Sequence, residues 1–306
     1  MAHSRFLKDT GLTVRMTTVM FLLGGLFVAL IVGAMYVAAS SGYGGAVPII
    51  GAIGIGIAVY QWWNSDKAAM RAMRAYEVTP EDFPELHGTI DRLCALAEMP
   101  KPRVGISEMD IPNAFATGRS PDRAVVCVTT GIMGKLTPEE LEAVLAHELS
   151  HVAHRDVLVM TIAASAGIVA GMMARGAQYG AIFGRSRSRE GAIGLVGALV
   201  ISLVVYAISF FLLRLLSRYR ELCADRAGAY LTLKPAALAS ALQKITGEMA
   251  AIPQGDLRAT KSMNAFFIAP AISGATLRTL TSTHPSLEQR LEQLARIQAE
   301  LGRPTT

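Results

Sequence analysis

Charge is scarce in this 306-residue sequence, and over one long stretch it is absent. Asp, Glu, Lys and Arg make up 17% of the residues and hydrophobic residues 52%, whereas soluble domains are about one quarter charged. This balance excludes an intrinsically disordered chain, which is poor in apolar residues. Three cysteines, none in a C-x-x-C pair, exclude a framework of paired disulfides. The composition therefore indicates a membrane protein.

Residues 16–65 contain no charged side chain. This uncharged stretch is long enough for two membrane spans of about 20 residues each. Helices are expected at residues 16–39 and 46–63, joined by a turn of glycine, serine and tyrosine. A cleavable signal peptide is the alternative, because basic residues precede the run. The run is longer than a signal core of about 7–15 residues, and a second apolar stretch follows at once. A helical hairpin is therefore predicted.

A second apolar pair lies at residues 157–174 and 191–213, with four arginines and one glutamate in its loop. Lys and Arg favour the cytoplasmic side of a membrane, so the basic flanks of the first hairpin place both of its ends there. If the second pair crosses the membrane, its arginine-rich loop lies on the side away from the cytoplasm, which conflicts with this rule. Either the rule is broken locally, or the second pair does not cross fully.

The expected fold is a mainly α membrane protein with four apolar helices and a cytoplasmic α+β domain with a small sheet. Residues 1–63 would form the N-terminal cytoplasmic tail and first hairpin, and residues 157–213 the second hairpin. Residues 64–156 and 214–306 would form the two halves of the cytoplasmic domain. Strands are expected at 103–107, 113–118 and 124–130, and helices at 80–99, 137–154, 215–233, 235–249 and 286–301.

The predicted helix at 137–154 contains an H-E-x-x-H sequence at residues 147–151. Positions four apart are offset by only about 40° around a helix, so His147 and His151 leave one face and can bind one zinc ion. Glu148 lies beside them, placed to take a proton from an attacking water. Two ordinary surface histidines are the alternative. His154 is rejected as a ligand because it lies about 10 Å from His147 along the axis.

A catalytic zinc usually takes three protein ligands. Glu221 and Asp225 are four residues apart on one face of the predicted helix at 215–233, and either carboxylate could in principle be the third ligand. The other would then accept the free N–H of a ligand histidine. The alternative is an exposed acidic pair among arginines, but the upstream histidines favour the ligand interpretation.

Four motifs together carry a resemblance to a known family: H-E-L-S-H at 147–151, R-E-L-C-A-D at 220–225, N-A-F-A-T-G at 113–118 and T-H-P at 283–285. In these motifs the chain resembles the HtpX family of membrane zinc metalloproteases, which are relatives of the CAAX prenyl-protein endopeptidases. The resemblance covers nearly the whole chain, including the order of the apolar segments. It implies a cytoplasmic gluzincin-type metalloprotease domain.

The resemblance also implies roles for individual residues. One Zn²⁺ per chain would be held by His147, His151 and Glu221, while Asp225 would orient a ligand histidine. Glu148 would be the general base, and His284 would stabilise the oxyanion. The substrate would be aligned by an edge strand whose relevant residues are Asn113, Ala114, Phe115 and Ala116. An edge strand suits a protease that cuts many sequences, because main-chain hydrogen bonds hold the peptide.

The expected function is hydrolysis of peptide bonds in misfolded or damaged membrane proteins during envelope stress. The expected location is the cell inner membrane, with both termini and the catalytic domain cytoplasmic, and with the lipid bilayer and other membrane quality-control proteases as partners. No nucleic-acid partner is expected, because Lys and Arg flank the apolar segments. A zinc-bound, non-proteolytic scaffold is the alternative, which Glu148 disfavours. A transporter is disfavoured because the apolar segments lack Asp, Glu, Lys and Arg.

Overall fold

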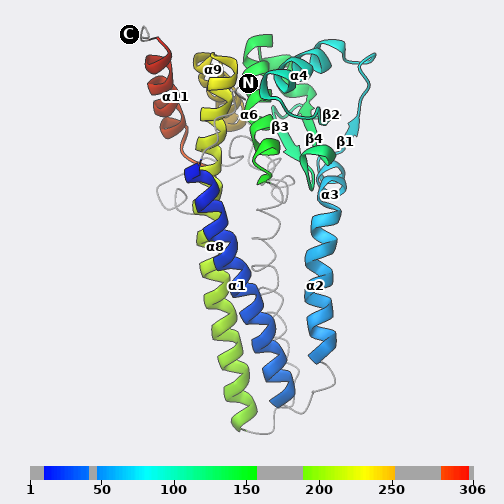
Figure 1. Cartoon of the computed structure of the whole chain (residues 1–306), viewed down its shortest axis with the longest axis vertical. Helices are drawn as coiled ribbons and strands as arrows, with labels where there is room; N and C mark the ends of the chain where they lie inside the picture. The colour runs from blue at the N-terminus through cyan, green and yellow to red at the C-terminus, as the bar shows by residue number, and fades with distance from the viewer. Residues whose placement is uncertain (1–9, 41–46, 157–188, 252–283, 303–306) are drawn as a thin grey trace. The chain divides into compact units, whose positions relative to one another are not determined.

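The computed structural model describes residues 10–40, 47–156, 189–251 and 284–302 of the chain. The chain divides into two compact units. One unit comprises Met1–Leu12, Asn64–Leu158 and Ser217–Thr306, and it carries the sheet and the motifs described above. The other comprises Thr13–Trp63 and Val159–Leu216. Figure 1 gives the helix and strand labels used below.

The unit without the sheet is built from long apolar helices: α1 (Thr10–Ser40), α2 (Val47–Trp63) and the first part of α8 (Arg189–Thr232). No helix in the described part of the chain combines the length and the hydropathy that crossing a membrane requires. Three of the four predicted apolar segments fall in these helices, and the segment at 157–174 lies outside the described residues. The four predicted spans therefore stay a prediction.

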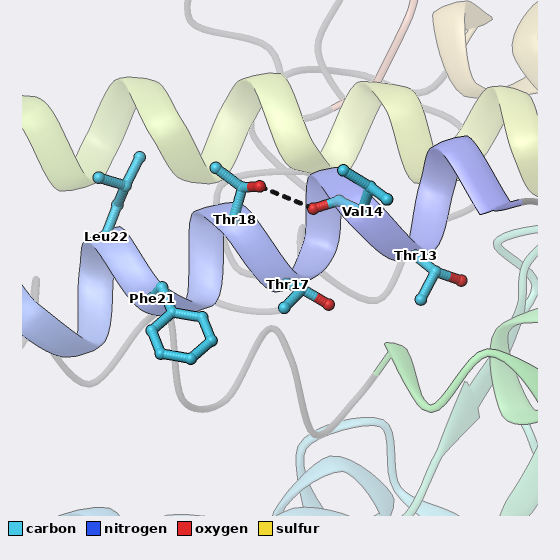
Figure 2. A pocket seen from close by; sticks show the side chains of 6 residues that line it. All are labelled: Thr13, Val14, Thr17, Thr18, Phe21 and Leu22. Atoms are coloured by element: carbon cyan, nitrogen blue, oxygen red, sulfur yellow. Dashed lines mark hydrogen bonds between the residues drawn. The ribbon is translucent and has the colours of Figure 1, made fainter.

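Many large apolar side chains of these helices are exposed, among them Phe21, Ile55, Leu203 and Phe211. Figure 2 shows a pocket along α1 lined by Thr13, Val14, Thr17, Thr18, Phe21 and Leu22. The Thr18 hydroxyl in this pocket donates a hydrogen bond to the Val14 carbonyl at 2.8 Å. The polar group on this apolar surface is thus satisfied by the backbone of its own helix.

The sequence predicted a helix at 215–233 separate from the apolar segment at 191–213, and this division is wrong. Helix α8 runs without interruption through Arg214. The side chains change from apolar to charged near Arg214. The sequence there contains neither proline nor glycine, so nothing interrupts the backbone hydrogen bonds of the helix.

The sheet has four strands in the order β1-β2-β4-β3: β1 (Ala75–Glu77), β2 (Arg103–Ser107), β3 (Ala114–Thr117) and β4 (Val125–Thr129). Strands β2 and β4 are parallel, while β1 and β3 run antiparallel to their neighbours. The three predicted strands are confirmed, and β1 was missed. Strand β1 is only three residues long, too short for an alternating pattern. Strand β3 lies at the edge of the sheet, paired with β4 alone among the described residues.

Helix α6 (Pro138–Ala153) packs against β3 and against α9 (Pro235–Ala251). Its start is a capping box: the Thr137 hydroxyl accepts from the Glu140 N–H, and the Glu140 carboxylate accepts from the Thr137 N–H. Each side chain thus satisfies a backbone donor that a helix start leaves open. The same device, from Ser286 and Gln289, starts α11 (Leu287–Leu301).

Helix α4 (Pro84–Ala97) begins four residues later than predicted. A hydrogen-bonded turn between Thr79 and Asp82 precedes it, and Pro84 then takes the first helical position. Proline suits that position because its missing N–H is not needed there. Three short helices were not predicted: α3 (Ser65–Ala72), η2 (Pro121–Arg123) and α5 (Thr130–Lys135). The irregular segment predicted at 252–283 lies outside the described residues.

Candidate metal centre

Three donor atoms converge at the face of α6. The Nε2 atoms of His147 and His151 are 3.3 Å apart. Each also lies 3.6 Å from a carboxylate oxygen of Glu221, which comes from α8. All three side chains are buried. The i, i+4 spacing therefore brings both imidazoles to one point, as predicted, and the packing of α8 adds the carboxylate.

The spacing of these donors fits a tetrahedral metal ion. Ligand nitrogen and oxygen atoms bound to zinc at about 2.0–2.2 Å lie about 3.3–3.6 Å from one another. The two Nε2 atoms have this separation, and each lies 3.6 Å from a different carboxylate oxygen of Glu221. The two imidazole rings are nearly perpendicular, at 89°, so their Nε2 lone pairs approach the common point from different directions. One donor atom from each of the three residues lies within 4.8 Å of the others, so the group could hold a metal ion.

Each candidate ligand histidine has a carboxylate behind it. Nδ1 of His147 lies 2.9 Å from Asp225, and Nδ1 of His151 is hydrogen-bonded to Asp156 at 2.6 Å. A carboxylate at Nδ1 keeps the proton on that nitrogen and leaves Nε2 free to bind a metal. Asp225 therefore lies where the prediction expected it.

Arginines in turn hold the two aspartates. Arg290 of α11 makes a two-pronged contact with Asp225, at 2.7 Å and 2.6 Å. Arg220 of α8 lies 2.8 Å from Asp156. The forked contact of Arg290 fixes the Asp225 carboxylate in one orientation. Each imidazole thus stands at the end of a His–Asp–Arg chain whose aspartate is buried.

Burial and these neighbours have opposing effects on the acidic groups. Burial alone would raise the pKa of Asp225, but the charge and hydrogen bonds of Arg290 together with His147 outweigh burial and lower the pKa. Burial also opposes ionisation of Asp156, and Arg220 with His151 again lowers the pKa of that carboxyl. For Glu221, burial is outweighed by His284, His147 and His151, so its pKa lies well below the usual range. All three carboxyls are therefore anionic.

Glu148 differs from these carboxyls. Burial raises its pKa, and the charges of His147 and His151 offset only part of that effect. The backbone of Ala116 on β3 hydrogen-bonds to its carboxylate. A buried carboxylate beside the donor cluster, with a raised pKa, has the property that a general base requires.

His284 lies at the same cluster, with Nδ1 at 3.4 Å from Glu221, and its side chain is buried. It lies two residues before the Ser286 cap of α11. His154, in contrast, ends α6 and turns its Nδ1 to the Ser150 carbonyl at 2.8 Å. It is not part of the metal-binding group of His147, His151 and Glu221.

The predicted substrate segment is the edge strand and the residue before it. The Asn113 N–H donates to the Thr129 hydroxyl at 2.9 Å, and the Asn113 carbonyl accepts from the Thr129 N–H at 2.9 Å. The backbone of Asn113 is therefore fixed to β4. Ala114, Phe115 and Ala116 continue along β3, paired with β4 on one side.

Sequence reasoning missed Asp156, Arg220 and Arg290 as parts of the site. Arg220 was part of the motif at 220–225 without a role of its own, and Arg290 fell in the predicted helix at 286–301. Asp156 follows His151 by five residues, and that spacing was the one local signal available. The two arginines reach the site only through the packing of α8 and α11.

Two histidines and a glutamate around a metal position, beside a buried glutamate, define a metallopeptidase. Residues 80–298 match the profile of Peptidase family M48. The chain belongs to this family, in its HtpX group of metalloproteases.

The relatives match over almost the entire chain. The chain is 52% identical to "Protease HtpX homolog 1" of Streptomyces coelicolor, covering 98% of this chain and 97% of that protein. It is 48% identical to "Protease HtpX homolog" of Moorella thermoacetica, covering 96% and 97%. The crystal structure of S. mikatae Ste24p has a similar fold, with a TM-score of 0.52 at 18% identity. That match covers 92% of this chain but only 65% of the Ste24p chain.

Proposed function

We propose that the protein is a membrane-bound zinc endopeptidase whose metal is held by His147, His151 and Glu221. The observation that carries this proposal is the convergence of three buried side chains, with the two Nε2 atoms 3.3 Å apart and each 3.6 Å from a carboxylate oxygen of Glu221. A zinc ion held by these residues would supply Lewis acidity, polarising the peptide carbonyl and acidifying water. Two imidazoles and one carboxylate form a donor set typical of catalytic zinc.

Glu148 acts as the general base in this proposal. It takes a proton from the water that adds to the peptide carbonyl, and then passes that proton to the leaving amine as the C–N bond breaks. A raised pKa suits both steps, because the carboxyl must hold the proton between them. The backbone of Ala116 fixes the carboxylate toward β3, where the substrate is expected.

The substrate binds as an extended peptide along β3, at Asn113, Ala114, Phe115 and Ala116. The outer edge of a sheet offers main-chain donors and acceptors independently of the side chains. His284, buried beside Glu221, stabilises the oxyanion that forms from the carbonyl. These roles rest on the family resemblance and on the places of the residues around the donor cluster.

The substrates are misfolded or damaged membrane proteins, and the cellular role is envelope-stress quality control. The protein lies in the cell inner membrane with its termini and residues 64–156 and 214–306 in the cytoplasm, where other quality-control proteases are expected partners. The exposed apolar side chains of α1, α2 and α8 support contact with lipid. Labels at residues 2 and 306 should both react from the cytoplasmic side, and external labelling of either would contradict this orientation.

The catalytic proposal is tested with Glu148→Gln in detergent-purified protein. The substitution removes the base and leaves the ligands, so zinc should stay near one per chain while digestion of casein disappears. Full residual proteolysis would overturn the mechanism. Wild type that binds zinc and cleaves nothing would favour a non-proteolytic scaffold instead.

A further inference from the structure

The short helix α3 begins one residue after the apolar helix α2 ends, with only Asn64 between them in the chain. Helix α2 contains no charged residue and ends in Trp62 and Trp63, whose rings pack edge to face with their centroids 6.1 Å apart. Tryptophan prefers the level of the lipid headgroups at a membrane surface. With α2 in the bilayer, as the proposed function requires, the chain enters α3 at that level.

Helix α3 has a buried face and a basic face on opposite sides. Ala69 and Met73, the residue that caps the helix, are completely buried. Lys67 and Arg71 are exposed. At 100° per residue, they lie about 160° and 200° around the helix from Ala69, so both point away from the buried face. Arg74, which is also exposed, follows the cap and adds a third positive charge.

The buried face of α3 is fastened to the sheet. Met70 Sδ lies 3.2 Å from Cys127 Sγ on β4, and the Ser107 hydroxyl of β2 donates a hydrogen bond to the Met73 carbonyl. The helix also packs against β1 and β3. These contacts fix the rotation of α3 about its axis, so its basic face stays on the outside.

The positive charge of this face is not neutralised within the described part of the chain. Asp66 is the only acidic residue of α3, and its carboxylate lies 2.8 Å from the guanidinium of Arg103 on β2. No ion pair among the described residues engages the side chains of Lys67, Arg71 or Arg74. The surface therefore suits an anionic partner.

We infer that Lys67, Arg71 and Arg74 form a docking surface for the headgroups of anionic phospholipids. The inference rests on the membrane location proposed above and adds a lipid class and the residues that bind it. Lysine and arginine bind phosphate, and arginine can donate two parallel hydrogen bonds to one phosphate group. The choline of phosphatidylcholine cancels the charge of its phosphate, whereas phosphatidylglycerol keeps a net negative charge. The surface therefore selects the anionic lipid and holds the sheet at the level of the headgroups.

The test uses the fluorescence of Trp62 and Trp63, the only two tryptophans of the sequence, because Trp63 is 52% exposed and precedes α3 by two residues. Full-length protein is reconstituted into vesicles of equal parts phosphatidylglycerol and phosphatidylcholine, with quenching bromine atoms on the acyl chains of one lipid or the other. The ratio of the two quenching efficiencies measures which lipid is enriched there. Phosphatidylglycerol should be enriched about twofold or more beside the wild type. The combined variant Lys67→Gln, Arg71→Gln and Arg74→Gln should lose this enrichment and retain its zinc content.

The matched control removes the same number of positive charges from surface residues that are already paired with carboxylates: Arg92→Gln, Lys101→Gln and Arg296→Gln. It should keep the enrichment, and so should a variant that retains the charges of the docking surface: Lys67→Arg, Arg71→Lys and Arg74→Lys. Loss of the enrichment in either of these variants would overturn the docking surface.

The other outcomes separate the docking surface from the proposed function. Equal quenching by the two lipids beside the wild type overturns the docking surface and leaves the protease unaffected, as does an enrichment that survives in the combined Gln variant. Loss of the enrichment on adding inorganic phosphate at constant ionic strength would mean that free phosphate is the occupant, which also overturns lipid docking. No quenching by either lipid would place Trp63 outside the bilayer, and would overturn the proposed membrane location together with the docking surface.

Discussion

Gly228 of α8 lies directly against the backbone of His147 on α6. A Cβ at position 228 would come within 2.9 Å of the His147 nitrogen and 3.2 Å of its Cα. Glu221, Asp225 and Gly228 are separated by four and three residues, so they share one face of α8. The absence of a side chain at Gly228 therefore permits the close approach by which the two carboxylates reach the histidines.

Gly228→Ala should separate the helices at the metal site. Overpacking against a backbone costs about 1–3 kcal/mol, and zinc affinity should fall because Glu221 moves away from His147. Zinc affinity is measured by competition with a chelator, alongside thermal unfolding. Gly247→Ala is the control, because nothing lies within 4 Å of a Cβ there; it should retain zinc and leave stability equal or slightly higher. Wild-type zinc affinity in Gly228→Ala would show that the close contact does not position the ligands.

The two carboxylates of α8 should respond differently to neutralisation. Glu221→Gln removes an anionic ligand and should lose most of the zinc and all activity. Asp225→Asn leaves the ligands in place but weakens the orientation of His147 and the ion pair with Arg290, so zinc affinity or activity should fall about 10–100-fold. Zinc titration of both purified variants decides the assignment. Tight binding by Glu221→Gln, with loss of metal in Asp225→Asn, would reverse the two roles.

Asp156→Asn should resemble Asp225→Asn, because Asp156 stands behind His151 as Asp225 stands behind His147. We expect zinc affinity to fall about 10–100-fold. Asp91→Asn provides the control, since the Asp91–Lys101 ion pair lies at the surface and contributes little. The zinc affinity of both variants is measured by competition with a chelator. Unchanged zinc affinity in Asp156→Asn would mean that Arg220 or the helix alone orients His151.

The Glu140 carboxylate should make stability depend on acid pH. Burial raises its pKa, but hydrogen bonds from Lys244, Ser240 and Thr137 outweigh this and lower the pKa to about 2. The folded protein thus binds the proton more weakly than the unfolded chain, so this stabilisation is present above about pH 4.5 and is lost as the pH falls toward 2. Glu140→Gln should cost about 1–3 kcal/mol at pH 7.

Thermal unfolding of wild type and Glu140→Gln in detergent, measured from pH 7 downward, tests this dependence. The difference between the two melting temperatures should narrow below pH 4.5. Glu139→Gln is the matched control, because Glu139 is the exposed neighbour in the same helical turn. If the difference in melting temperature between wild type and Glu140→Gln stayed constant with pH, the charge of Glu140 would not contribute to stability.

Local signals in the sequence predicted the elements of the site well. The capping sequence at Thr137 gave the start of α6 within one residue, since a cap depends only on neighbours a few positions away. The four-residue spacing of His147 and His151 predicted their common face, because the helix itself sets that geometry. The three strands at 103–107, 113–118 and 124–130 were also predicted, the last from a valine-rich run bounded by turn residues.

Interactions between distant segments could not be predicted in the same way. From the residues alone, Glu221 and Asp225 were equivalent as ligands, and only the family resemblance separated them. In the structure, Glu221 lies 3.6 Å from both Nε2 atoms, while Asp225 lies behind His147. Glu221 and Asp225 lie one helical turn apart on α8. The way α8 packs against α6 decides which of them faces the metal position and which orients a ligand histidine.

By itself, the sequence determined which side chains could do the chemistry: two histidines on one helical face, a neighbouring glutamate and an acidic pair further along the chain. Only the tertiary structure decided which groups surround them. Arg290 reaches Asp225 from α11, and Arg220 reaches Asp156 from α8. The physical reason is that helix periodicity acts over a few residues, whereas the burial that brings charges together depends on the packing of the whole unit.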